Sequence, residues 1–306
     1  MRFIYVLIFS GFLSFLDSGC DSTRADNAKE TKQDKGKKDK KNKKEKESVS
    51  AGVKVEQKWE LPDILQEISG FAYISPNRFA CVQDEAGAIF IYNTAEEKIE
   101  KQISFGASGD YEGLALAGKT AFVIRSDGQL FRVENIDSRD KPAIKSYTTG
   151  LTAKNNVEGL TYDAKNNRLL IAIKGSETSE TDFKGIYAFD LTTQKLIAEP
   201  VFKINLKDEA FQNRQVKNVN AAIQPADLAL NPTTEDLYVV EATNPQLVIL
   251  NKQGNIKNRF VLSSKEFSQP EGLTFSPNGD FYIANEGKKE PGNILKISLT
   301  NQPAEM

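Results

Sequence analysis

The chain has 306 residues, with 40 Lys and Arg against 42 Asp and Glu, and it contains no histidine. The missing imidazole excludes a Ser-His-Asp or Cys-His relay, a histidine general base near pH 7, and histidine-ligated zinc or haem. A bound metal ion would therefore need carboxylate and carbonyl oxygens, which are the ligands of hard ions such as Ca²⁺ and Mg²⁺.

The formal net charge of −2 hides two segments of opposite sign. Residues 1–50 carry 12 basic and 8 acidic side chains, whereas residues 51–306 carry 28 basic and 34 acidic ones. The body of the chain is therefore acidic, and we expect it to bind no nucleic acid.

Residues 1–19 have the features of a signal peptide. An uncharged apolar run over residues 3–16 follows Arg2 and is too short to span a bilayer comfortably. A Ser-Gly-Cys sequence that ends at Cys20 resembles a bacterial lipobox, although Asp17 stands where that motif usually has an aliphatic residue. We predict export, lipidation of Cys20, and localisation in the cell envelope as a lipid-anchored membrane protein.

Residues 20–51 form a Lys-rich segment without aromatic side chains. Such a segment cannot bury enough apolar surface to offset its ordering entropy, so we expect a disordered linker. A polybasic contact with anionic lipid headgroups is the alternative, although the acidic residues between the lysines weaken the attraction.

A short motif recurs five times in the body of the chain. It reads Ser-Gly-Phe-Ala, Glu-Gly-Leu-Ala, Glu-Gly-Leu-Thr, Ala-Asp-Leu-Ala and again Glu-Gly-Leu-Thr. Its second residues are Gly70, Gly113, Gly159, Asp227 and Gly272, with spacings of 43, 46, 68 and 45. Three of the four spacings match the period of roughly 40 to 50 residues that is typical of propeller blades.

Each motif begins an apolar strand pattern, and further strand patterns follow after turn sequences rich in Asn, Gly and Pro. The sequence thus predicts an all-β fold, a five-bladed β-propeller over residues 52–300, with 301–306 as a tail. A six-bladed propeller is the alternative, because one interval is longer. Its extra residues, at 174–184 and 207–222, are polar and offer no four-stranded blade, which favours five.

The fifth repeat ends after its third strand, near Leu299. Residues 53–61 precede the first repeat and show strand-like alternation with no partner of their own. We predict that this N-terminal strand completes the fifth blade and closes the ring, which leaves no open sheet edge.

In a propeller blade the first strand lines the central channel, and the second strand runs antiparallel to it. The start of the first strand and the end of the second therefore meet at one rim, where we expect acidic side chains to gather. These are Asp84, Glu85, Glu112, Glu158, Glu241, Glu271 and Glu286. Because like charges repel unless something positive sits among them, a calcium ion held by these carboxylates is one interpretation of the rim.

Two basic residues, Arg125 and Lys174, end the second strands of blades two and three and support other interpretations. They can pair with Glu112 and Glu158 of the same blades, which would make the rim an ion-pair network. They can also form a clamp for a phosphate or carboxylate ligand.

The motifs resemble those of the SdiA-regulated family of bacterial envelope β-propellers. The resemblance covers residues 53–299 and rests on the Glu-Gly-Leu copies, on Asp110-Tyr-Glu-Gly-Leu-Ala, and on Gly279-Asp-Phe-Tyr-Ile-Ala-Asn-Glu after the last copy. The Ala226-Asp227 copy departs from the pattern. The resemblance implies a membrane-associated or periplasmic propeller, and members of the family have been connected with calcium homeostasis without a firmly assigned enzymatic activity.

We therefore predict a non-enzymatic, monomeric binding, signalling or scaffold module linked to calcium. Its expected partners are the membrane, through the lipid anchor, and an unidentified small ligand or envelope protein. The alternative is a metal-dependent phosphoesterase or a lactone hydrolase, in which rim carboxylates hold the metal and the two basic residues hold the anionic substrate.

Overall fold

The computed structural model describes residues 51–175, 182–212 and 221–300. The expected signal peptide, the lipidation site at Cys20, most of the Lys-rich linker and the C-terminal tail lie outside these residues. Within the described ranges no helix is long and apolar enough to cross a membrane.

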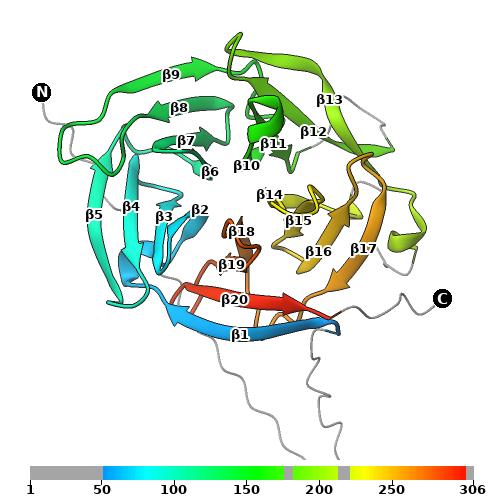
Figure 1. Ribbon diagram of the computed structural model, residues 1–306. Coiled ribbons are helices and arrows are strands. Elements are labelled where there is room, and N and C mark those ends of the chain that lie inside the picture. The colour runs from blue at the N-terminus through cyan, green and yellow to red at the C-terminus, as the bar shows by residue number, and fades with distance from the viewer. Residues whose placement is uncertain (1–50, 176–181, 213–220, 301–306) are drawn as a thin grey trace, which may run out of the picture. The chain divides into compact units, whose positions relative to one another are not determined.

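The described residues form five antiparallel four-stranded sheets arranged in a ring (Figure 1), so the predicted five-bladed β-propeller is confirmed. Blade 1 comprises β2 (Ile68–Ser75), β3 (Arg78–Gln83), β4 (Ala88–Asn93) and β5 (Lys98–Ser104). Blade 2 comprises β6 (Tyr111–Ala117), β7 (Thr120–Arg125), β8 (Gln129–Val133) and β9 (Ile144–Thr148). Blade 3 comprises β10 (Val157–Asp163), β11 (Arg168–Ile173), β12 (Phe183–Asp190) and β13 (Lys195–Asn205).

The last two blades follow the same order from the centre outwards. Blade 4 comprises β14 (Pro225–Leu230), β15 (Leu237–Glu241), β16 (Gln246–Leu250) and β17 (Ile256–Val261). Blade 5 comprises β18 (Pro270–Phe275), β19 (Phe281–Asn285), β20 (Asn293–Leu299) and β1 (Val53–Glu60). Short 3-10 turns occur at η1 (Asp63–Leu65), η2 (Ala164–Asn166) and η3 (Glu209–Phe211).

The N-terminal strand closes the ring as predicted. β1 pairs antiparallel with β20, from Val53 opposite Leu299 to Glu60 opposite Asn293. Figure 1 shows the first and last strands side by side at the outer edge of blade 5. This pairing joins the two ends of the propeller in one sheet.

The turn between the first and second strands of each blade requires a left-handed backbone conformation. The residues that adopt it are Asn77, Gly118, Asn167, Glu235 and Gly279. Glycine and asparagine tolerate a positive φ at little cost. Glu235, with φ of 58°, is the exception among these five turns, and it lies in blade 4.

The hydrophobic core is divided into five clusters, each between two adjacent blades. Between blades 5 and 1, for example, Phe79 packs edge-on against Tyr282, with ring centroids 5.1 Å apart. Because both faces of each inner sheet are covered by neighbouring blades, strands such as β4 and β16 are almost entirely buried. Packing between blades therefore holds the ring together.

The motif glycines allow the innermost strands to approach one another. A Cβ atom on Gly113 would lie 2.8 Å from the carbonyl oxygen of Glu158, and one on Gly159 would lie 2.7 Å from the Cα atom of Asp227. Real Cβ atoms do not come so close to backbone atoms, so these two positions need glycine.

Asp227, which replaces the motif glycine in blade 4, links three blades. Its carboxylate oxygens accept hydrogen bonds from the backbone N–H groups of Leu160 at 3.2 Å and Leu273 at 2.7 Å. These donors belong to β10 and β18, the innermost strands on either side of β14. Burial raises the pKa of Asp227 well above its usual range, although the backbone hydrogen bonds act in the opposite direction.

Replacing Asp227 with alanine should destabilise the propeller by roughly 2–4 kcal/mol, because two buried N–H groups lose their acceptor. Asp227→Asn keeps one acceptor oxygen, so its loss should be smaller. Equilibrium unfolding in urea measures both values. Equal losses in the two variants would contradict the linking role assigned to the carboxylate.

Candidate functional site at the channel mouth

Each copy of the motif contains a β-bulge near the start of the innermost strand. In blade 2, Tyr111 pairs with Arg125 and Gly113 pairs with Ile124, so Glu112 has no partner across the strand. The same break in register falls at Ser69, Ala226, Glu271 and the Glu158-Gly159 pair. A bulge re-aims the side chain of the extra residue. The innermost strands surround the centre of the ring (Figure 1), so the bulges fall around its central axis at the start of these strands, a region that we call the channel mouth.

The three motif glutamates come together although they belong to different blades. Repulsion from Glu158 and Glu271 contributes to the raised pKa of Glu112, and Glu158 contributes in turn to the raised pKa of Glu271. Such mutual effects require the carboxyl groups to lie close together in a poorly solvated place. The acidic rim expected from the sequence includes these three glutamates, from blades 2, 3 and 5.

Glu158 is the motif glutamate with a basic partner. Its Oε2 atom lies 3.2 Å from Nζ of Lys174, and Nδ2 of Asn156 donates a 2.6 Å hydrogen bond to its Oε1 atom. Burial raises the pKa of Glu158 to about 7, although Lys174 acts to lower it. Burial acts to lower the pKa of Lys174, but the charge and hydrogen bond of Glu158, with the charges of Glu271 and Glu112, together outweigh it and the net shift is upward. The ion pair considered in the sequence analysis is present in blade 3.

Glu112 has a different partner from the one considered in the sequence analysis. Arg125 turns to Asp127, with Nε 2.9 Å from Oδ1 and Nη2 2.6 Å from Oδ2. Glu112 instead shares a hydrogen bond with Asp110, and burial followed by repulsion from Glu158 raises its pKa to about 10. At neutral pH this carboxyl group is therefore protonated. The ion pair between Glu112 and Arg125 that the sequence suggested is absent from the described contacts, and Glu112 is hydrogen-bonded to the carboxyl group of Asp110.

Glu271 also belongs to a pair of carboxyl groups. It shares a hydrogen bond with Glu286, and Nε2 of Gln269 donates to both glutamates. Burial, followed by repulsion from Glu286, raises the pKa of Glu271 to about 8. The pKa of Glu286 is raised as well, chiefly by burial.

Asp84 extends the acidic mouth towards blade 1. Burial raises its pKa to about 6, and repulsion from Glu67, Glu85, Glu286 and Asp110 adds to the shift. Among the described residues its Oδ1 atom is buried without a hydrogen-bond partner. Asp84 therefore stands next to the glutamate pair of blade 5.

Two residues expected at the mouth lie elsewhere, and strand register explains why. Arg125 and Glu241 are each paired with the first residue of the innermost strand, Tyr111 and Pro225. Lys174, Glu286 and Asp84 each come one position later in their blades, and successive side chains of a strand point to opposite faces. The positions on the channel side are thus the later ones.

Glu241 lies fully buried inside blade 4. Its carboxylate accepts hydrogen bonds from Nδ2 of Asn244 at 3.1 Å and from Nε2 of Gln246. Glu85 is exposed, and its carbonyl oxygen accepts a 3.1 Å hydrogen bond from the N–H group of Gly109.

One further set of mouth residues is absent from the residues expected from the sequence. These stand two positions before the motif residue and are Glu67, Asp110, Asn156 and Gln269. Asp110, Asn156 and Gln269 each hydrogen-bond the motif glutamate of their own blade. Their common spacing from the motif is the signal in the sequence that could have identified them.

The donor chemistry of the mouth suits a hard cation, because carboxylate and amide oxygens are the ligands that Ca²⁺ prefers. The geometry is not that of a preassembled metal centre. Within the three described ranges, no group of three or more acidic or cysteine side chains is arranged so that it could hold a metal ion. Four of the carboxyl groups are instead tied into two pairs by shared hydrogen bonds, Glu112 with Asp110 and Glu271 with Glu286.

The fold and the acidic mouth define a five-bladed β-propeller with a polar channel entrance. The family model described as SdiA-regulated matches residues 47–177 and 207–305. The chain therefore belongs to the SdiA-regulated family. A sequence comparison with curated proteins finds no match.

Solved structures resemble the chain in fold. Glutaminyl cyclase from Myxococcus xanthus aligns with a TM-score of 0.54 and 13% identity, over 81% of this chain and 97% of that one. Hydrazine synthase from Kuenenia stuttgartiensis aligns with a TM-score of 0.43 and 14% identity, over 73% of this chain and 56% of that one. At 13% identity the likeness to the glutaminyl cyclase concerns the fold alone.

The free energy of unfolding should fall as the pH rises from 5 to 9. Glu158, Glu271 and Glu112 have pKa values of about 7, 8 and 10 in the folded protein, above the usual 4.5. The folded state thus binds more protons than the unfolded state in this window, and raising the pH favours unfolding. Urea unfolding at pH 5, 7 and 9 measures the slope.

Glu112→Gln should flatten this pH dependence, because the amide imitates the protonated acid. Glu199→Gln, at an exposed position on β13, provides the matched control and should leave the slope unchanged. A stability that is constant or rises across the range would show that the mouth carboxyl groups ionise normally.

Proposed function

We propose that the protein is a non-enzymatic binding module of the cell envelope that takes up a cation at its channel mouth. Ca²⁺ is the ion we propose, and the lipidated Cys20 with the Lys-rich linker is the proposed tether. Membership of the SdiA-regulated family supports this proposal, because members of the family have been connected with calcium homeostasis.

The observation that carries the proposal is the charge balance at the mouth. Carboxyl groups from blades 1, 2, 3 and 5 gather there, at Asp84, Asp110, Glu112, Glu158, Glu271 and Glu286. The Lys174 ammonium contacts one of them, Glu158. If all the carboxyl groups ionised, the negative charge would far exceed the positive charge, and an added cation would relieve the repulsion.

A cation would bind at the mouth in exchange for protons. Glu112 and Glu271 hold their protons near neutral pH because burial and neighbouring charges raise their pKa values. A divalent ion would favour the ionised carboxylates and so release these protons. The pairs with Asp110 and Glu286 would have to separate for their oxygens to face one ion, which implies a rearrangement of side chains on binding.

Ca²⁺ binding should therefore be stronger at pH 8.5 than at pH 6.5 and should release protons. Isothermal titration calorimetry in two buffers with different ionisation enthalpies measures both the Kd and the number of protons. Glu112→Gln combined with Glu271→Gln should weaken binding by roughly tenfold or more, which corresponds to about 1.4 kcal/mol.

Glu199→Gln controls for the loss of an exposed negative charge and should bind like the unaltered protein. The proposal fails if no heat of binding is measured, or if the control loses as much affinity as the mouth variant. Hydrolysis of a phosphomonoester or lactone that disappears in Glu271→Gln would replace the binding role with the hydrolase alternative.

Lipidation of Cys20 should be detectable as incorporation of an alkyne-labelled fatty acid in a bacterial host. Cys20→Ser should remove the label, because the thiol that carries the lipid is absent. Cys81→Ser is the matched control, since Cys81 is buried in the propeller and should not be modified. Equal labelling of the two variants would contradict a lipid anchor at Cys20.

A further inference from the structure

A cavity lies between blades 3 and 4, at the opposite ends of the innermost strands from the acidic mouth. It has a volume of about 540 Å³. Tyr162 and Asp163 near the end of β10 and Leu230 at the end of β14 line it, together with the turns that follow these strands. Cavities of this size are typical of sites for small organic ligands.

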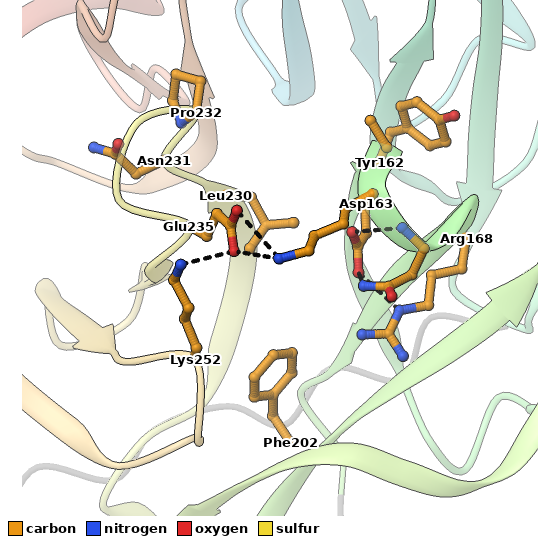
Figure 2. Close-up of a pocket in the computed structure, with 12 residues that line it drawn as sticks. Tyr162, Asp163, Arg168, Phe202, Leu230, Asn231, Pro232, Glu235 and Lys252 are labelled. Atoms are coloured by element: carbon orange, nitrogen blue, oxygen red, sulfur yellow. Dashed lines mark hydrogen bonds and ion pairs between the residues drawn. The ribbon is translucent and has the colours of Figure 1, made fainter.

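One part of the cavity wall is apolar. Phe202 from the outermost strand of blade 3 lies opposite the turn that contains Pro232, and Leu230 lies behind them (Figure 2). Phe202 and Leu230 are only partly buried, although both pack against the core between blades 3 and 4. An aromatic ring and an aliphatic side chain at an open cavity can cover the apolar body of a ligand.

On the blade 3 side, the cavity holds a firmly oriented guanidinium group. Nε of Arg168 lies 2.8 Å from Oδ2 of Asp163, and Asp163 also accepts hydrogen bonds from the backbone N–H and the Nδ2 atom of Asn166. The carboxylate of Asp163 is nearly buried, with 9% of its side chain exposed. This network fixes the planar guanidinium at the cavity wall, beside Phe202 in Figure 2.

On the blade 4 side, two lysines converge on one glutamate. Nζ of Lys165 lies 3.0 Å and Nζ of Lys252 lies 2.9 Å from Oε2 of Glu235. Glu235 is the residue whose positive φ sets it apart from the Asn and Gly residues in the matching turns. For a residue other than Gly, Asn or Asp such a conformation is uncommon and costs energy, and functional sites often contain residues of this kind.

Among the described residues that line it, the charged groups are three cations and two carboxylates, so this part of the wall has one excess positive charge. We propose that this cavity, which we call the interblade pocket, binds a small organic monoanion with a flat apolar body. Its oxyanion group would lie between Arg168 and the two lysines, and its apolar body would pack on Phe202 and Leu230.

The flexibility of the two lysines suits this role. The side chains of Lys165 and Lys252 are 70% and 52% exposed, so their ion pairs with Glu235 are well solvated and contribute little to stability. An entering oxyanion can therefore share both ammonium groups at little cost. Arg168 adds planar donors, which match the geometry of a carboxylate, phosphate or sulfonate.

Binding in the interblade pocket is independent of the proposed function. None of the residues that line the pocket belongs to the acidic mouth. The pocket is proposed to bind an anion, whereas the acidic mouth is proposed to bind a cation. A protein that binds no Ca²⁺ could still bind an anion in the interblade pocket. A protein that binds no anion there could still bind Ca²⁺ at the mouth.

Anilinonaphthalene sulfonate is a suitable probe, because it is a singly charged aromatic sulfonate whose fluorescence rises in apolar surroundings. We expect saturable one-site binding to the folded protein. The double variant Lys165→Gln/Lys252→Gln should raise the Kd roughly tenfold. Phe202→Ala should also weaken binding, because it removes the aromatic part of the wall.

The matched control is Lys98→Gln/Lys207→Gln, which removes two exposed lysines that pair with Glu96 and Asp182 outside the pocket. Its Kd should stay within about twofold of the unaltered value. The proposal is overturned if the probe shows no saturable binding, if the control weakens binding as much as the pocket variant, or if Phe202→Ala binds normally. Unchanged far-ultraviolet circular dichroism confirms that each variant is folded.

Discussion

The innermost strands of blades 2 and 3 approach so closely that a methyl group on Gly113 would meet the backbone of Glu158 at 2.8 Å. This close approach of the innermost strands also brings the motif carboxyl groups together in one poorly hydrated space. Burial is accordingly the first cause of the raised pKa at Glu112, Glu158 and Glu271. Blade 4 has Asp227 in place of the motif glycine. Its carboxylate accepts hydrogen bonds from the backbones of β10 and β18 and so joins the innermost strands on either side.

The sequence was sufficient to predict the fold because propeller blades repeat. Five copies of one motif defined the innermost strands, and an unpartnered N-terminal strand predicted how the ring closes. Both features depend on alternation of apolar residues and on chain length, which are visible without coordinates. Even the irregular Ala226-Asp227 copy was recognisable as a departure, although its role in bridging β10 and β18 was not.

The site was less predictable because it depends on single-residue register. A β-bulge re-aims the side chain at each motif copy, and no composition or periodicity signal marks where the extra residue falls. At the ends of the second strands, Arg125 and Glu241 were grouped with Lys174 and Glu286, yet the two sets differ by one position and so face different ways. The hydrogen bond between the carboxyl groups of Glu112 and Asp110 likewise depends on burial, which cannot be read from the sequence.

The pairing of β1 with β20 has a consequence for the order of events during synthesis. Val53 is made before blades 1 to 4, but its partner Leu299 is made after them. The outer edge of the fifth blade therefore cannot be completed until almost the whole propeller is available, and the first strand must wait without its partner. Contacts between such distant parts of a chain form slowly.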